Sequence, residues 1–114
     1  MCHCLSCQKI SGGTHTLNLL VPEGEFRVTD GSPKDYTVTH ESGMKLTVHF
    51  CDNCGGVIYK TADNDLFRGY AIVQAGTLDD QEGLEQAKPE MELYTKYRAP
   101  WLSNLDWAAQ KQGF

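Results

Sequence analysis

The feature that most constrains this chain is the spacing of its five cysteines. Cys2, Cys4 and Cys7 fall within the opening run MCHCLSCQKISGG, and Cys51 and Cys54 form a second cluster in CDNCGG. An odd number of cysteines in two tight clusters makes a poor disulfide framework, and persistent disulfides are rare in reducing compartments. The spacing therefore predicts metal ligands, and zinc is the ion that such thiolate groups usually hold.

Length and composition place the chain among small globular proteins. We expect one domain over residues 1–114, because 114 residues can bury one core but not two ordinary ones. Its apolar runs are too short to cross a bilayer, and it opens without the pattern of a secretory signal, so we expect a cytoplasmic protein with no membrane partner. A net charge of −5 with scattered basic residues argues against a nucleic-acid partner.

Hydrophobic alternation predicts a mainly β fold with about eight short strands and one or two minor helices. The clearest signal is a hairpin of Tyr36–Thr39 and Met44–Phe50, whose even positions from Met44 onward should face the core. Further strands are expected over 16–21, 26–29, 57–59, 66–75 and 91–97. A helical turn is expected over 8–11, an acidic loop over 81–88 and a short helix over 102–109.

The five cysteines allow two zinc arrangements. In the first, Cys2 and Cys4 join Cys51 and Cys54 in a closed four-thiolate site and Cys7 is spare. In the second, Cys2, Cys4 and Cys7 form an open three-thiolate site, and Cys51 and Cys54 need other ligands. A closed site is structural, whereas an open one can accept a substrate thiol as fourth ligand and lower its pKa. Spacing alone leaves both arrangements open.

Other polar residues are weaker candidates. His3 lies between two predicted ligands and is a candidate for orienting a substrate or supplying a proton, with simple exposure as the competing interpretation. Lys96 and Arg98, near Tyr94 and Tyr97, are candidates for holding a small anion, with ordinary solvated charge as the alternative. Surface positions are expected for the remaining histidines, His15, His40 and His49.

Four blocks of the sequence resemble one family. The run CHCLSCQKISGG is similar to the signature of the CENP-V/GFA family, named for glutathione-dependent formaldehyde-activating enzyme. The resemblance continues in the same order through HFCDNCGG, through AGTLDD at residues 75–80 and through YRAPWL at residues 97–102. It implies an Mss4-like fold of folded antiparallel sheets carrying zinc.

The resemblance also implies an activity and roles for individual residues. Cys2, Cys4 and Cys7 match the family's catalytic zinc ligands, and Cys51 with Cys54 match half of its structural zinc site. The implied reaction is carbon–sulfur bond chemistry, the joining of glutathione to formaldehyde and the reverse lyase reaction. Because many relatives are expected to use other adducts, the implied substrate is a thiol adduct of a small aldehyde or another electrophile. Lys96 or Arg98 would then steer a glutathione carboxylate.

One part of the family pattern is not matched in this chain. Family members usually carry an earlier Cys-x-Cys strand, and this sequence has none before Cys2. Three explanations stay open: an N-terminally incomplete chain, a structural pair without partners, or use of Cys2 and Cys4 to complete the structural site. Exposed sheet edge left by such a loss would favour pairing into a homodimer. Two other function classes also stay open, a zinc-dependent tailoring enzyme that does not use glutathione and a non-catalytic zinc-stapled binding module.

Overall fold

The computed structural model describes all 114 residues, and their contacts group into two compact units. One unit comprises Met1–Asn18 and Leu78–Phe114, so the two ends of the chain belong to the same unit. The other comprises Leu19–Thr77. Neither α-helix has the length or the apolar character that crossing a membrane requires.

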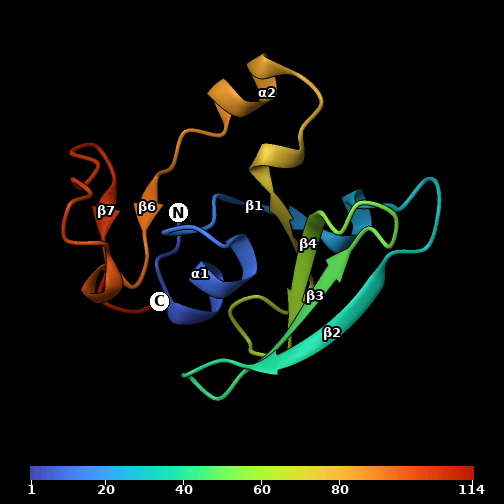
Figure 1. Ribbon diagram of the computed structural model, residues 1–114, viewed down its shortest axis with the longest axis horizontal. Coiled ribbons are helices and arrows are strands. Elements are labelled where there is room, and N and C mark those ends of the chain that lie inside the picture. Colours follow the sequence, from blue (N-terminus) through green and yellow to red (C-terminus); the bar gives the residue numbers. More distant parts are fainter. The chain divides into compact units, whose positions relative to one another are not determined.

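The unit formed by Leu19–Thr77 is built around a five-stranded sheet (Figure 1). Its strands run in the order β1-β5-β4-β3-β2, so β1 and β2 form the edges, and the pairs β2–β3, β3–β4 and β4–β5 are antiparallel. The mainly β prediction is confirmed. The strand bounds are β1 Asn18–Pro22, β2 Lys34–Thr39, β3 Lys45–Phe50, β4 Val57–Ala62 and β5 Tyr70–Gln74.

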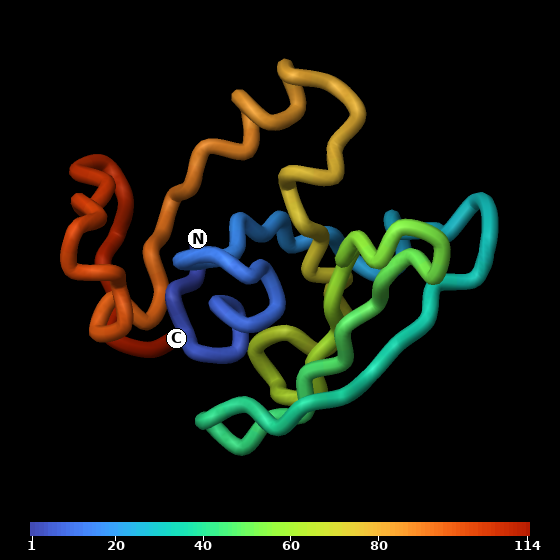
Figure 2. Tube along the Cα trace, in the orientation of Figure 1, coloured from blue at the N-terminus to red at the C-terminus, as the bar shows by residue number.

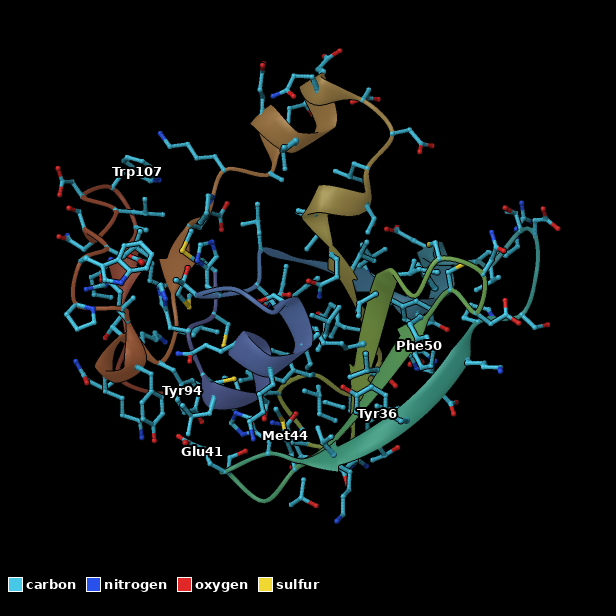
Figure 3. The ribbon with its side chains drawn as sticks, viewed as in Figure 1. Tyr36, Glu41, Met44, Phe50, Tyr94 and Trp107 are labelled. Atoms are coloured by element: carbon cyan, nitrogen blue, oxygen red, sulfur yellow. The ribbon has the colours of Figure 1, made fainter.

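The predicted hairpin is confirmed as β2 and β3. Its turn is closed by bonds from the His40 N–H to the Met44 carbonyl and from the Gly43 N–H to the His40 carbonyl. Gly43 has a φ of 89°, a conformation that glycine adopts without steric cost. Met44, Leu46 and Val48 are buried as the alternation predicts, and Phe50 is half-buried against Tyr36 (Figure 3).

The unit that contains both chain ends holds the opening cysteine run. Helix α1 spans Leu5–Ser11 and ends at Gly12, whose left-handed φ of 66° provides the predicted glycine stop. Strands β6 Met91–Glu92 and β7 Ala109–Gln110 pair in parallel, and residues 1–3 lie beside residues 91–93 through backbone hydrogen bonds (Figure 2). The opening run is thus held against a segment about ninety positions later in the chain.

Several predicted elements are wrong, and the structure supplies reasons. Residues 26–29 form no strand because they have no neighbouring strand to pair with; Phe26 instead packs against Tyr59 with ring centroids 4.6 Å apart. The predicted acidic loop is helix α2, Gln81–Gln86, which begins because the Asp80 carboxylate accepts a bond from the Gly83 N–H. The chain has seven strands, against an expectation of about eight.

The end of the chain differs most from prediction. The strand expected over 91–97 stops at Glu92, and a 3₁₀ turn, Thr95–Tyr97, follows after Tyr94 takes a left-handed φ of 57°. The helix expected over 102–109 is replaced by turns and β7. The Leu105 N–H donates to the side chain of Glu92 rather than to a carbonyl one helical turn earlier. A distant carboxylate therefore replaces the local hydrogen bond that a helix would need.

Candidate metal centre

Three buried thiols come together in the unit that contains the chain ends. The Sγ atoms of Cys2, Cys4 and Cys7 all lie within 4.8 Å of one another. A tetrahedral zinc site with Zn–S bonds of about 2.3 Å needs sulfurs roughly 3.8 Å apart, so this spacing fits one ion. The three side chains are at most 4 % exposed, and their sulfurs are soft ligands that suit zinc.

Backbone pairing holds Cys2 from both sides. Its N–H donates to the Thr16 carbonyl at 2.9 Å, and its own carbonyl accepts from the Thr16 N–H at 3.0 Å. On the other side the His3 N–H donates to the Leu93 carbonyl, and the Leu93 N–H donates to the Met1 carbonyl. Cys2 is therefore fixed in a small sheet rather than left as a fraying end.

The start of α1 places the other two thiols. Cys4 is the N-cap of the helix, and its Sγ accepts a bond from the Cys7 N–H at 3.3 Å. This is the geometry that serine or aspartate provides in most N-caps, with sulfur replacing oxygen. Cys7 lies in the first turn, where its side chain meets Cys4. Because two residues separate Cys4 from Cys7, the start of the helix places their sulfurs close together in the protein interior.

Crowding and burial raise the pKa values of these thiols. The pKa of Cys2 is raised well above its usual range by hydrogen bonds with Cys4 and Cys7, and then by burial. For Cys4, the bond with Cys2 lowers the pKa, but the bond with Cys7 and burial raise it to about 11. Several thiolates cannot sit so close in a buried place unless a cation neutralises them. The donor set therefore fits a divalent ion, which would compensate this charge.

A buried carboxylate that sequence reasoning missed lies next to this centre. Glu92 is fully buried, and its Oε1 is 2.8 Å from Nε2 of His3. Its Oε2 accepts from the Leu105 N–H at 2.8 Å and from the Gln110 amide at 2.6 Å. Burial alone would raise the pKa of Glu92, but these bonds and the charge of Arg98 hold it at about 2.

His3 is buried rather than exposed. The side chain has no exposed surface; its Nε2 faces Glu92, and its Nδ1 has no hydrogen-bond partner. Its ring lies 5.5 Å from that of His15, which is half-buried, so the expected surface position of His15 is not met in full. His40 is also buried, because its Nδ1 takes part in the β2–β3 turn with Ser42, and the surface prediction for it is wrong.

Aromatic side chains cover the thiols. Tyr94, labelled in Figure 3, is 5 % exposed and belongs to the same buried cluster as the three cysteines. The partly buried side chains of Leu93, Tyr97 and Phe114 pack against this cluster. The Phe114 ring meets Tyr94 edge-on at 5.0 Å. Tyr94 is the one non-glycine residue with a positive φ, a conformation that persists only where surrounding contacts enforce it.

The two predicted anion-binding residues have different surroundings. The Lys96 ammonium lies over the rings of Tyr97 and Tyr94, at 4.9 and 5.4 Å from the ring centroids, on an exposed side chain. The Arg98 guanidinium contacts Glu92 at 3.3–3.4 Å and also the Gln110 side chain. Arg98 is therefore engaged by a carboxylate within the protein, whereas Lys96 presents its charge at the surface.

Cys51 and Cys54 lie in the other unit, on the loop between β3 and β4. The Gly55 N–H donates to the Cys51 carbonyl, and the Gly56 N–H donates to Sγ of Cys54 at 3.4 Å. The pKa of Cys51 is lowered by backbone N–H groups of Cys54 and Asn53 and by the Cys54 thiol. A turn that points N–H groups at its sulfurs is typical of one half of a thiolate zinc site. The zinc-ligand assignment of this pair stays a prediction.

The protein is small and mainly β, and it holds a buried group of three thiols at a helix start. These features place it in the class of proteins whose fold can carry a thiolate metal centre. The family model described as glutathione-dependent formaldehyde-activating enzyme matches residues 1–97. The chain belongs to this family, as its cysteine blocks predict. No curated protein matches the chain.

Proposed function

We propose that this protein is a zinc-dependent carbon–sulfur lyase or synthase that acts on the thiol adduct of a small aldehyde or another electrophile. The observation that carries the proposal is the group of three buried thiols without a fourth cysteine in it. Three protein ligands and one open position are typical of catalytic zinc, whereas structural zinc is held by four. Family membership supports glutathione as the thiol.

The protein's own residues would do three things. Cys2, Cys4 and Cys7 would hold the ion, and a zinc ion held there would lower the pKa of a substrate thiol. Tyr94 and Phe114 would keep bulk water away from the sulfurs, which strengthens each charge interaction beside them. Lys96 would attract a glutathione carboxylate, and Arg98 is a weaker candidate because Glu92 already neutralises it.

The reaction that we propose needs no redox partner. In the synthase direction the substrate thiol gives up its proton, its sulfur forms a bond to the carbonyl carbon as the π pair of the carbonyl moves to oxygen, and the oxygen takes up the proton. The lyase direction is the reverse: the hydroxyl loses its proton, the carbonyl re-forms, and the bonding pair leaves with sulfur. A catalytic His3 would have to carry that proton on Nδ1, since its Nε2 is bonded to Glu92.

The test combines metal content with turnover. Zinc is measured in protein purified without chelator, and adduct formation is followed by exchange NMR in mixtures of glutathione and ¹³C-formaldehyde. We expect Cys7→Ser to lose zinc from the three-thiol site and to lower turnover at least a hundredfold, because an open site cannot spare one of its three ligands. Unchanged zinc and turnover in this variant would contradict Cys7 as a ligand.

Substrate class is tested separately. Turnover with glutathione but not with 2-mercaptoethanol supports recognition of the peptide part, and Lys96→Gln should then raise KM with little change in kcat. Equal turnover with both thiols would instead mean that the enzyme does not recognise the peptide part of glutathione. Zinc without turnover of any adduct would favour the non-catalytic module.

A further inference from the structure

The most extensively bonded buried group in this unit is the Glu92 carboxylate, which accepts from His3, Arg98, Leu105 and Gln110. We propose that Glu92 is a positioning residue for the metal centre: through His3 it holds the opening loop in the geometry that brings the three thiols together. This inference rests on the proposed zinc site. It gives Glu92 and His3 a shared role that neither the family match nor the cysteine spacing provides.

The pairing of the two segments fixes which side chains share a face. Cys2 forms a parallel bridge with Leu93, so the side chains of these two residues point to the same side. Their neighbours His3 and Glu92 point to the opposite side, where they meet at 2.8 Å. The thiols therefore lie on one face of the opening segment, and the His3–Glu92 pair lies on the other face.

Glu92 is held so firmly that it can act as an anchor. Its second oxygen accepts from the Leu105 N–H and from the Gln110 amide, and the Arg98 guanidinium contacts both oxygens. An ionised carboxylate only accepts hydrogen bonds, so Nε2 of His3 is the donor and carries the hydrogen. The bond thus ties His3 to a carboxylate that its other donors hold in a fixed position.

Loss of this bond would leave the His3 ring without a hydrogen-bond partner. Its Nδ1 already has none, and the whole ring is buried, so both ring nitrogens would then be unsatisfied inside the protein. An unsatisfied buried polar group is costly, and the ring would move toward water to recover its hydrogen bonds. Because Cys2 and Cys4 are its immediate neighbours, that movement would displace two of the three thiols.

The first experiment measures metal affinity. Co²⁺ is titrated into the metal-free protein of residues 1–114, its thiolate charge-transfer band is followed, and Zn²⁺ is then added in competition. We expect Glu92→Gln to weaken binding at the three-thiol site by about ten- to a hundredfold, because an amide has only one acceptor oxygen and its NH2 end would face the donor of His3 or those of Leu105 and Gln110. Glu90→Gln makes the same chemical change at an exposed position two residues away and should leave affinity unchanged.

A second pair of variants separates positioning from proton transfer. Gln at position 3 keeps an N–H donor at about the reach of Nε2 but cannot carry a proton at neutral pH. A positioning role predicts that His3→Gln binds Co²⁺ within about threefold of wild type, whereas His3→Ala loses affinity as Glu92→Gln does. If His3 is instead a proton carrier, both His3 variants lose turnover and both keep metal affinity, which would overturn the proposal.

The remaining outcomes also decide whether the role proposed for Glu92 stands. If Glu92→Gln fails to fold, the two His3 variants carry the test alone, because Glu92 keeps its other donors in them. Wild-type affinity in Glu92→Gln, or no Co²⁺ or Zn²⁺ binding by the wild type, overturns the inference. A wild type that turns over no thiol adduct, together with weakened metal binding in Glu92→Gln, overturns the proposed function and leaves the inference standing.

Discussion

At the scale of single residues, the Glu92 carboxylate is a buried group that accepts hydrogen bonds from His3, Arg98, Leu105 and Gln110. It sits in the run PEMELYTKY, two positions after Glu90, yet Glu90 is exposed and Glu92 is completely buried. The apolar neighbours Met91 and Leu93 are the only local hint, because alternation would place Glu92 on the opposite side from Leu93. Which groups lie on that side depends on segments far away in the chain.

The lowered pKa of Glu92 predicts a specific pH dependence of stability. In the unfolded chain this carboxyl protonates near its ordinary pKa of 4.5, whereas in the folded protein it stays ionised down to about 2. Its contribution is therefore complete above about pH 5 and is lost as the pH falls from 4.5 toward 2. We expect Glu92→Gln to lower the free energy of unfolding by about 2–4 kcal/mol at pH 7, measured by urea titration.

The difference between wild type and Glu92→Gln should shrink steadily below pH 4.5. Glu90→Gln, measured in parallel, should stay close to wild type at every pH because its side chain is exposed. A constant difference between wild type and Glu92→Gln down to pH 2 would contradict the ionised, hydrogen-bonded state of Glu92.

At the scale of elements, the sequence predicts an element correctly where the element's own residues determine it. The hairpin of β2 and β3 follows from alternation and a glycine turn, and α1 ends at the expected glycine. Helix α2 was missed because Gly83 and a run of charged residues resemble a loop, although Asp80 is a good N-cap. Its start depends on one side chain.

A matched pair of substitutions tests the start of α2. Asp80→Ala removes the acceptor for the Gly83 N–H and should cost about 1 kcal/mol, with faster hydrogen exchange of the amides of residues 83–87. Asp79→Ala removes the neighbouring carboxylate, which lies one position before the cap, and should leave this exchange close to wild type. Equal exchange in the two variants would mean that the cap does not hold the helix.

At the scale of the whole molecule, the contacts form two units, although a single domain is expected from the length. The prediction of one domain can be tested because two spectroscopic probes report on different units. Both tryptophans, Trp101 and Trp107, lie in the unit with the chain ends, and most strand residues lie in the other unit. Tryptophan fluorescence and far-UV circular dichroism therefore report mainly on different units.

We expect thermal unfolding followed by these two probes to give coincident transitions, because one cooperative domain unfolds all at once. The comparison is made on zinc-loaded protein and repeated after chelation. A fluorescence transition several degrees below the dichroism transition in zinc-loaded protein would show that the two units unfold separately, and the single-domain prediction would then be wrong.

The sequence by itself determined the family, the mainly β character, the central hairpin and the grouping of Cys2, Cys4 and Cys7. These features arise from neighbouring residues: a strand's alternation, a turn's glycine, and thiols five positions apart at a helix start. Only the tertiary structure decided what surrounds the thiols. The parallel pairing of residues 1–3 with 91–93 buries His3 against Glu92, and the Leu105 N–H donates to the Glu92 carboxylate in the segment where a helix is expected. Such bonds join positions about ninety and thirteen residues apart, so no local pattern can reveal them.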